Sequence, residues 1–190
     1  MSDSSTGGPL LQTSPLIANW FDDDVLFNFF HDFIMGLTGL AGDLIIPRWQ
    51  LEPPNIPTNA NWCAFGINSY QSDVYAAEII QANDSYEVRR HETINLLVSF
   101  YGNNPGGYAR TFRDGMQLSQ NRESLTLQGM GLIESGDIVQ LPSLMKERWL
   151  KRADLPFSIR RQSVRTFAVL PLLTSQVGLD NEHYTLTVNN

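Results

Sequence analysis

The first strong pattern along the chain is a stripe of apolar residues with helical spacing between Asp24 and Leu37. One row repeats every fourth position, and a second row lies beside it. The rows are Val25, Phe29, Phe33 and Leu37, then Leu26, Phe30 and Ile34. Acidic residues before the stripe suit the positive end of a helix dipole, and the glycines after it end the pattern. The stripe predicts a helix over residues 24–37 that packs one face on the core.

Farther along, the pattern changes to the alternation of half-buried β-strands. Trp62–Ser69, Glu87–Tyr101 and Trp149–Gln162 alternate in this way. Asp73–Gln81 is a further strand candidate, and the turn residues Ala82–Ser85 after it predict a hairpin. The residues predicted to face the core are Cys63, Phe65, Ile67, Ile94, Leu96, Val98, Phe100, Trp149, Ala153, Leu155, Phe157 and Ile159.

A second helix is predicted after the turn Gly102–Gly107, because Tyr108, Phe112 and Met116 are four residues apart. Shorter apolar stretches predict additional strands. These are Leu44–Leu51, Ile133–Leu141, Thr166–Leu173 and a weak last strand at His183–Val188. Hairpins with interposed helices indicate an α+β fold, in which a mostly antiparallel sheet packs against two or more α-helices.

The length of 190 residues suits one buried core. Composition predicts a flexible arm over residues 1–23, a single α+β domain over 24–175, and a C-terminal tail or edge strand over 176–190. No apolar run reaches the roughly 20 residues that span a bilayer, and the N-terminus lacks the pattern of a signal peptide. Because Cys63 is the single cysteine, no disulfide can form within the chain, which indicates a reducing compartment.

Three prolines lie within the segment Glu52–Pro57. Proline lacks an amide donor, so this segment cannot be the interior of a helix or a central strand. It predicts a stiff, exposed loop. Two interpretations stay open: a plain connector, or a contact element containing Pro53 and Pro54 that loses little entropy on docking.

Charge is distributed unevenly around a net value of −7, which argues against sequence-independent binding of nucleic acid over a large face. Residues 1–47 hold six acids and no Lys or Arg, whereas residues 146–165 hold seven basic and two acidic residues. We hypothesise that the two segments meet between copies of the chain, in a head-to-tail contact. Two alternatives stay open: the two segments pair within one chain, or both are solvated surfaces without a partner. The residues of this hypothetical interface are Asp22, Asp23, Asp24, Arg148, Lys151, Arg152, Arg160 and Arg161.

No catalytic, cofactor-binding or metal-binding pattern passes a test of spacing. The histidines His31, His91 and His183 lack metal-ligand spacing, and Cys63 has no base nominated beside it. Three consecutive acids at a helix start splay around the axis and lack the alternating spacing of a calcium loop. Gly102–Gly107 has neither a Gly-Lys-Ser/Thr ending nor a G-x-G-x-x-G register.

A set of short strings, read in order, resembles the neck or tail terminator-like proteins of tailed bacteriophages. The resemblance covers about residues 24–172. The strings are PRWQLEPPNIP at 47–57, WCAFGI at 62–67, RHE at 90–92, SFYG at 99–102, RDG at 113–115, QNR at 120–122, GMGL at 129–132, RWLKRADL at 148–155 and RRQ at 160–162.

This resemblance implies a tail-terminator-like fold and a structural protein of the virion, assembled in the bacterial host cytoplasm. In tail terminators, subunits form a hexameric ring that stops growth of the tail tube and joins it to the head-to-tail connector. The implied partners are further copies of the chain, the tail tube protein, possibly a sheath protein, and the connector protein. DNA would pass through the lumen without specific contacts. The family supplies no catalytic residues and no cofactor.

Three alternatives stay open. A head-completion or connector ring of the neck belongs to the same class, and ring symmetry would distinguish it from a terminator. A non-viral, protein-binding or ligand-binding module would be a monodisperse monomer at high concentration. A small hydrolase or transferase would need a deep pocket that gathers His91 with Cys63 or with acids.

Overall fold

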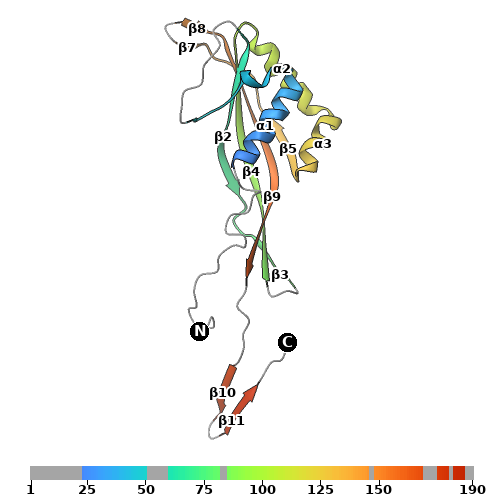
Figure 1. The fold of residues 1–190 in the computed structure, drawn as a ribbon, viewed down its shortest axis with the longest axis vertical. Coiled ribbons are helices and arrows are strands. Elements are labelled where there is room, and N and C mark those ends of the chain that lie inside the picture. The colour runs from blue at the N-terminus through green and yellow to red at the C-terminus, as the bar shows by residue number, and fades with distance from the viewer. Residues whose placement is uncertain are drawn as a thin grey trace. The chain divides into compact units, whose positions relative to one another are not determined.

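The computed structural model describes residues 23–50, 60–81, 85–145, 148–168, 175–179 and 182–186. These residues form two compact units. The larger takes its residues from 23–76 and 90–163, and the smaller from 77–89 and from 164 onward. In the larger unit, α1, α2 and α3 lie on one side of the strands β2, β4 and β9 (Figure 1).

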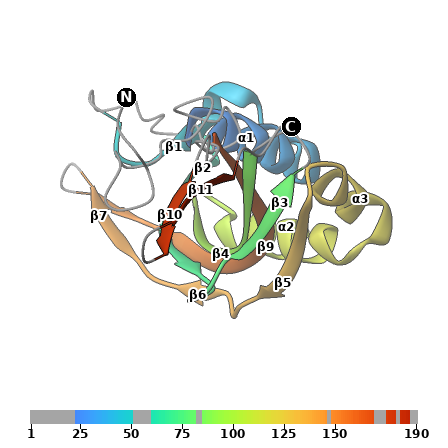
Figure 2. The same cartoon turned by 90° about the horizontal axis from the view of Figure 1, so that it is seen from below.

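The sheet of the larger unit has the order β1-β2-β4-β9-β5. β1 pairs with β2 in parallel, whereas β2 pairs with β4 and β5 pairs with β9 in antiparallel orientation, which confirms the predicted α+β class with a mostly antiparallel sheet. Figure 2 shows the same layers from below, with the helices on one side of the sheet. The strands are β1 (Ile45–Pro47), β2 (Trp62–Ser72), β4 (Ser85–Tyr101), β5 (Met130–Ser135) and β9 (Arg152–Ala168).

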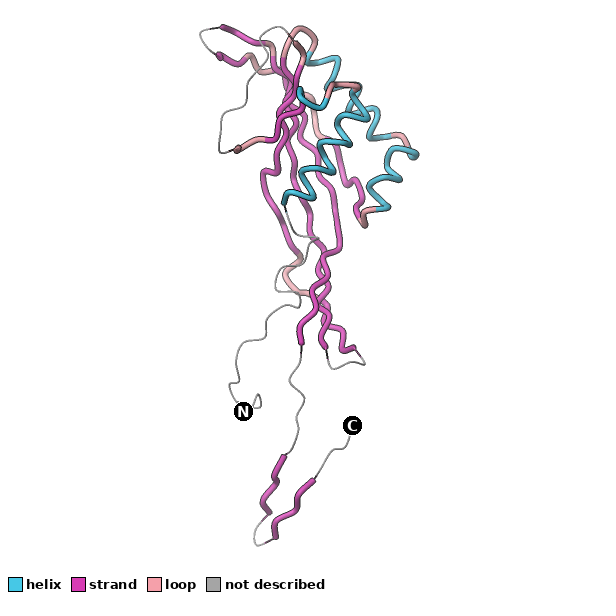
Figure 3. The backbone as a smooth tube through the Cα atoms, viewed as in Figure 1, coloured by secondary structure: helices cyan, strands magenta, loops and turns pink. Residues whose placement is uncertain are grey.

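Three α-helices cover the sheet: α1 (Asp23–Thr38), α2 (Pro105–Gln117) and α3 (Ser119–Leu127) (Figure 3). The predicted first helix is therefore confirmed, with one extra residue at each end. Asn104 caps α2, because its side-chain oxygen accepts the Gly107 amide at 3.2 Å. Leu118 has an extended backbone and separates α2 from α3.

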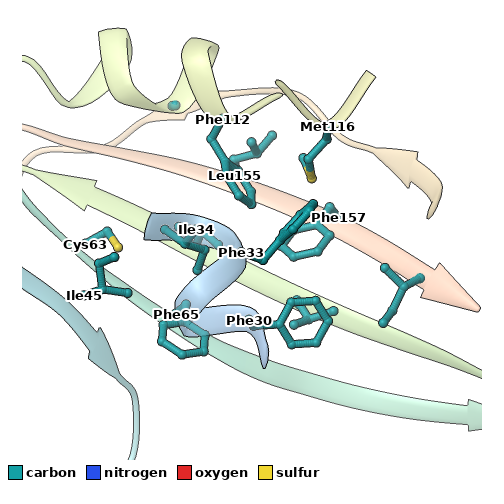
Figure 4. Close-up of a cluster of buried hydrophobic side chains, with 14 of the residues drawn as sticks. Phe30, Phe33, Ile34, Ile45, Cys63, Phe65, Phe112, Met116, Leu155 and Phe157 are labelled. Atoms are coloured by element: carbon teal, nitrogen blue, oxygen red, sulfur yellow. The ribbon is translucent and has the colours of Figure 1, made fainter. Parts of the chain in front are cut away.

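The core lies between these helices and the sheet (Figure 4). Phe157 of β9 packs edge-on against Phe30 of α1 and Phe112 of α2, with ring centroids 5.9 and 5.6 Å apart. The alternating positions of β2, β4 and β9 point toward the same layer, as their period predicts. The buried members from these strands are Cys63, Phe65, Ile94, Leu96, Val98, Phe100, Ala153, Leu155, Phe157 and Ile159.

In the smaller unit, β3 (Ala77–Gln81) pairs with the first residues of β4, which confirms the predicted hairpin. The strands β10 (Ser175–Leu179) and β11 (Glu182–Leu186) form a second antiparallel hairpin. The weak last strand is thus present, but the strand that pairs with it was not predicted.

Several predicted boundaries are wrong. The stretch Ile133–Leu141 is interrupted at residues 136–138, which divides it into β5 and β6 (Val139–Gln140). The stretch Trp149–Gln162 is also divided, into β8 (Arg148–Leu150) and β9. Residues 73–76 precede β3 without strand structure, and α3 was not predicted at all. Most of the predicted N-terminal arm and the Pro-rich loop lie outside the described residues.

Candidate subunit-contact surfaces

A row of polar side chains lies on the sheet face opposite the helices. Asp154 of β9 accepts two hydrogen bonds from Arg152, both at 2.6 Å, and one from the Ser99 hydroxyl at 2.5 Å. Arg48, which follows β1, donates to the same Ser99 oxygen. Gly66 leaves space for the Arg48 side chain to reach Ser99, because a Cβ at position 66 would lie 3.1 Å from the Arg48 Cβ. The row joins β1, β4 and β9 across the sheet.

Arg152 is held from a second direction by an aromatic pair. The rings of Trp62 and Tyr101 stack with centroids 4.1 Å apart, and the Arg152 guanidinium lies 5.7 Å from the centre of the Tyr101 ring. The hydrogen bonds to Asp154 are the main cause that raises the pKa of Arg152 above its ordinary value. Arg152, predicted from sequence as an interface residue, is therefore bound tightly within its own subunit.

Two more of the predicted interface arginines also have carboxylate partners in the same chain. Arg160 pairs with Asp73 at 3.0 Å on the exposed surface. Arg161 points to the core side of the sheet, where it pairs with Glu92 at 3.0 Å and both side chains are largely buried. Neither carboxylate is close to its arginine in sequence. Tertiary structure thus neutralises charge that looked available from the sequence.

A cationic recess, which we define by Arg110, Lys151 and Arg152, lies at the start of α2. Its volume is about 310 Å³, and Asn104, Gln140 and Pro142 also line it. Arg110 and Lys151 are exposed, and neither has a carboxylate partner among the described residues. Arg110 was not predicted as an interface residue, because it is separated in sequence from the basic segment 146–165.

The other predicted interface residues are only partly described. Asp23 begins α1, and Asp24 is exposed in its first turn. Arg148 begins β8. Asp22, Pro53 and Pro54 lie outside the described residues.

The hairpin of β7 (Ser143–Met145) and β8 is a surface that the sequence did not reveal. These strands form a sheet of their own, in which Leu144 lies directly opposite Trp149. Leu144 is 58% exposed and Trp149 is 71% exposed. The prediction that Trp149 faces the core is therefore wrong: the strand ends at Leu150, so the alternation of β9 does not extend back to it.

A second surface lies between α3 and β5, where a groove of about 680 Å³ is lined by both elements. Among the described strands, β5 pairs on one side only, with β9. Leu127 at the end of α3 is 77% exposed, and Ile133 of β5 is 50% exposed. Gln117 donates to the Ser135 hydroxyl at 3.3 Å and fixes the far end of β5 against α2.

The side chains that were candidates for catalysis or metal binding, Cys63 and His91 among them, have surroundings typical of structural residues. Burial raises the pKa of the Cys63 thiol to about 12, and His91 lies on the opposite face of the sheet. Within the described part of the chain, no three His, Cys, Asp or Glu side chains lie where they could share a metal ion. Among the described helices, none has the length and apolar character needed to cross a membrane.

The model of one protein family matches residues 24–182 of the chain, and its description is phage neck terminator protein. The chain belongs to this family. The match confirms the resemblance inferred from the short strings and covers most of the described residues. A search of curated proteins found no significant match. Membership of this family makes the chain a structural component of the phage neck, a role that involves contact with other head or tail proteins.

Proposed function

We propose that this chain forms a homo-oligomeric ring, a hexamer, that caps the tail tube and joins it to the head-to-tail connector. The observation that carries the proposal is the family match over residues 24–182. DNA would pass through the lumen of the ring. The net charge of −7 supports passage without tight binding, because a negative protein surface repels the phosphate backbone. The proposal includes no catalytic step.

A charged contact between copies is part of the proposal. Its acidic side is Asp22–Asp24, and its basic side is the cationic recess, where Arg110 and Lys151 lack a carboxylate partner among the described residues. Arg148, Arg160, Pro53 and Pro54 stay in the proposed interface as its periphery, whereas Arg161 is left out because it is largely buried against Glu92. Exposed ion pairs contribute little to affinity, so this contact would mainly set orientation and association rate.

The test is electron microscopy of the purified protein, alone and with tail tube subunits of the same phage. Six-fold rings, or tubes closed at one end, are expected. A monodisperse monomer in both samples would contradict the proposal. Rings whose symmetry differs from the six-fold tube, and which leave tube ends uncapped, would instead indicate a head-completion or connector ring. Tubes assembled with a sheath protein would show whether the ring also contacts a sheath.

A further inference from the structure

The hairpin β7–β8 exposes two large apolar side chains, Leu144 and Trp149, which the described part of the chain leaves mostly uncovered. Leu144 and Trp149 are direct cross-strand partners, and the strands that carry them pair only with each other among the described strands. An isolated two-stranded hairpin has little stability in water without a surface to pack on. Tryptophan is also one of the residue types enriched at the energetic centre of protein interfaces. Both properties indicate a contact arm.

The arm leaves the sheet at a defined place. Val139 and Gln140 of β6 pair with Asp154 and Ala153 of β9, and the Leu141 amide donates to the Arg152 carbonyl at 3.0 Å. The base of the arm is therefore part of the main sheet, and two of the β9 residues at this base, Arg152 and Asp154, form an ion pair. A rigid base lowers the entropy that a protruding hairpin loses on docking.

The groove between α3 and β5 is the candidate receptor for this arm. Its volume is about 680 Å³, and polar side chains of α3 and Leu132 of β5 line it. The two elements that form the groove also expose Leu127 and Ile133, although neither side chain lines the groove itself. The charged residues that line the groove are Arg122 and Glu123, but the wider sequence segments that contain the arm and the groove differ in net charge. Residues 141–151 carry three basic residues and one acid, whereas residues 118–138 carry Arg122 and three acids. The acids are Glu123, Glu134 and Asp137.

The arm and the groove lie at opposite sides of the larger unit. The views in Figures 1 and 2 agree on this arrangement, with β7 on one side and α3 on the other. A surface and its complement on opposite sides of one subunit produce a heterologous contact, which can close into a ring. A surface that bound the same surface on another copy would instead favour a two-fold dimer.

From these observations we propose that the β7–β8 arm of one copy docks in the α3–β5 groove of the next copy, with Trp149 and Leu144 as its apolar anchors. This inference rests on the proposed ring and assigns the contact between its subunits. It differs from the charged contact above, which involves the base of the arm rather than its apolar face.

The first test compares Trp149→Ala with Trp49→Ala by sedimentation velocity, in the presence of tail tube subunits where these are needed for assembly. Trp49 is a matched control because it is 69% exposed and lies outside the arm. Trp149→Ala should weaken assembly about tenfold or more, as expected for an interface tryptophan, while circular dichroism and thermal unfolding stay unchanged. Assembly of Trp149→Ala at wild-type concentrations, or equal losses in both variants, would overturn the inference.

The second test identifies the receiving surface by crosslinking. A short bismaleimide is added to a mixture of Leu144→Cys and Leu127→Cys proteins, in which the buried Cys63 contributes little background. Crosslinked dimers should appear only when the two variants are mixed. Dimers from Leu144→Cys alone would show that arms meet each other, which would overturn the head-to-tail contact. If wild-type protein assembles but the mixture gives no dimer, the inference fails and the proposed function stands; a wild type that never assembles refutes the proposed function itself.

Discussion

Asp154 holds the polar row on the helix-free face, so its neutralisation by Asp154→Asn is expected to destabilise the fold strongly. The change keeps the size of the side chain but removes the charge that Arg152 faces at 2.6 Å. It also turns one carboxylate oxygen into an amide nitrogen, which can only donate, so the side chain can no longer accept all the hydrogen bonds from Ser99 and Arg152. The partly buried guanidinium of Arg152 would then lack a carboxylate partner among the described residues.

The magnitude follows from the burial of the pair. Removing one partner of a buried ion pair costs about 3–5 kcal/mol, because the remaining charge is not compensated. The Arg152 side chain keeps 24% of its exposure and can recover part of its hydration, so the expected loss is about 2–4 kcal/mol. With a urea m-value of about 2 kcal/mol/M, the midpoint of unfolding should fall by about 1–2 M.

The assay is urea unfolding followed by far-UV circular dichroism at one fixed protein concentration. Asp114→Asn is the matched control, since Asp114 is 70% exposed and pairs with Arg113 at 3.4 Å. Its effect should stay below about 1 kcal/mol. Arg152→Met in the Asp154→Asn background should recover part of the loss, because it removes the uncompensated charge. A shift for Asp154→Asn no larger than that of the control would refute the reasoning.

Three further predictions concern single side chains. Phe157→Ala should cost about 3–5 kcal/mol in the free energy of unfolding, since it leaves a cavity between α1 and α2; a loss under 1 kcal/mol by urea unfolding would contradict this. The Cys63 thiol, with its pKa raised to about 12 by burial, should react with Ellman's reagent only after denaturation, and rapid labelling of the native protein would be inconsistent with its burial. The hydrogen bond to Asp32, the largest cause, and the Gly42 carbonyl raise the pKa of His31 above 6.5. Protonated His31 should therefore stabilise the fold relative to His31→Gln; this stability should be fully present below about pH 6.5 and should be lost as pH rises through the folded pKa. NMR titration should place the pKa of His31 above 6.5, and a value below 6.5 would refute the assignment.

Local periodicity was sufficient where an element buries one regular face. The helix over residues 24–37 and the alternation of Ile94, Leu96, Val98 and Phe100 could be predicted because each buried residue follows from the spacing of the backbone alone. The helix α3 lacks this signal, because Leu125 is its only buried residue. Its position depends on packing against α2 and β5, which no local pattern encodes.

The candidate surfaces were less predictable, since they depend on distant residues. Alternation correctly placed Arg152 and Arg160 on one face of their strand, but their surroundings include carboxylates and rings from other elements. Trp149 continued the apolar alternation in sequence and yet belongs to a separate hairpin, because alternation does not show where one strand ends and the next begins.

The sequence by itself determined the α+β class, the core faces of α1, β2, β4 and β9, and the family, because each depends on residue type and order along the chain. Tertiary structure alone decided which charges are already paired, that Arg110 joins Lys151 in the cationic recess, and that Trp149 is exposed on an arm. The physical reason is that burial and charge compensation are set by neighbours in space. Such neighbours can be tens of residues away, as Asp73 is from Arg160.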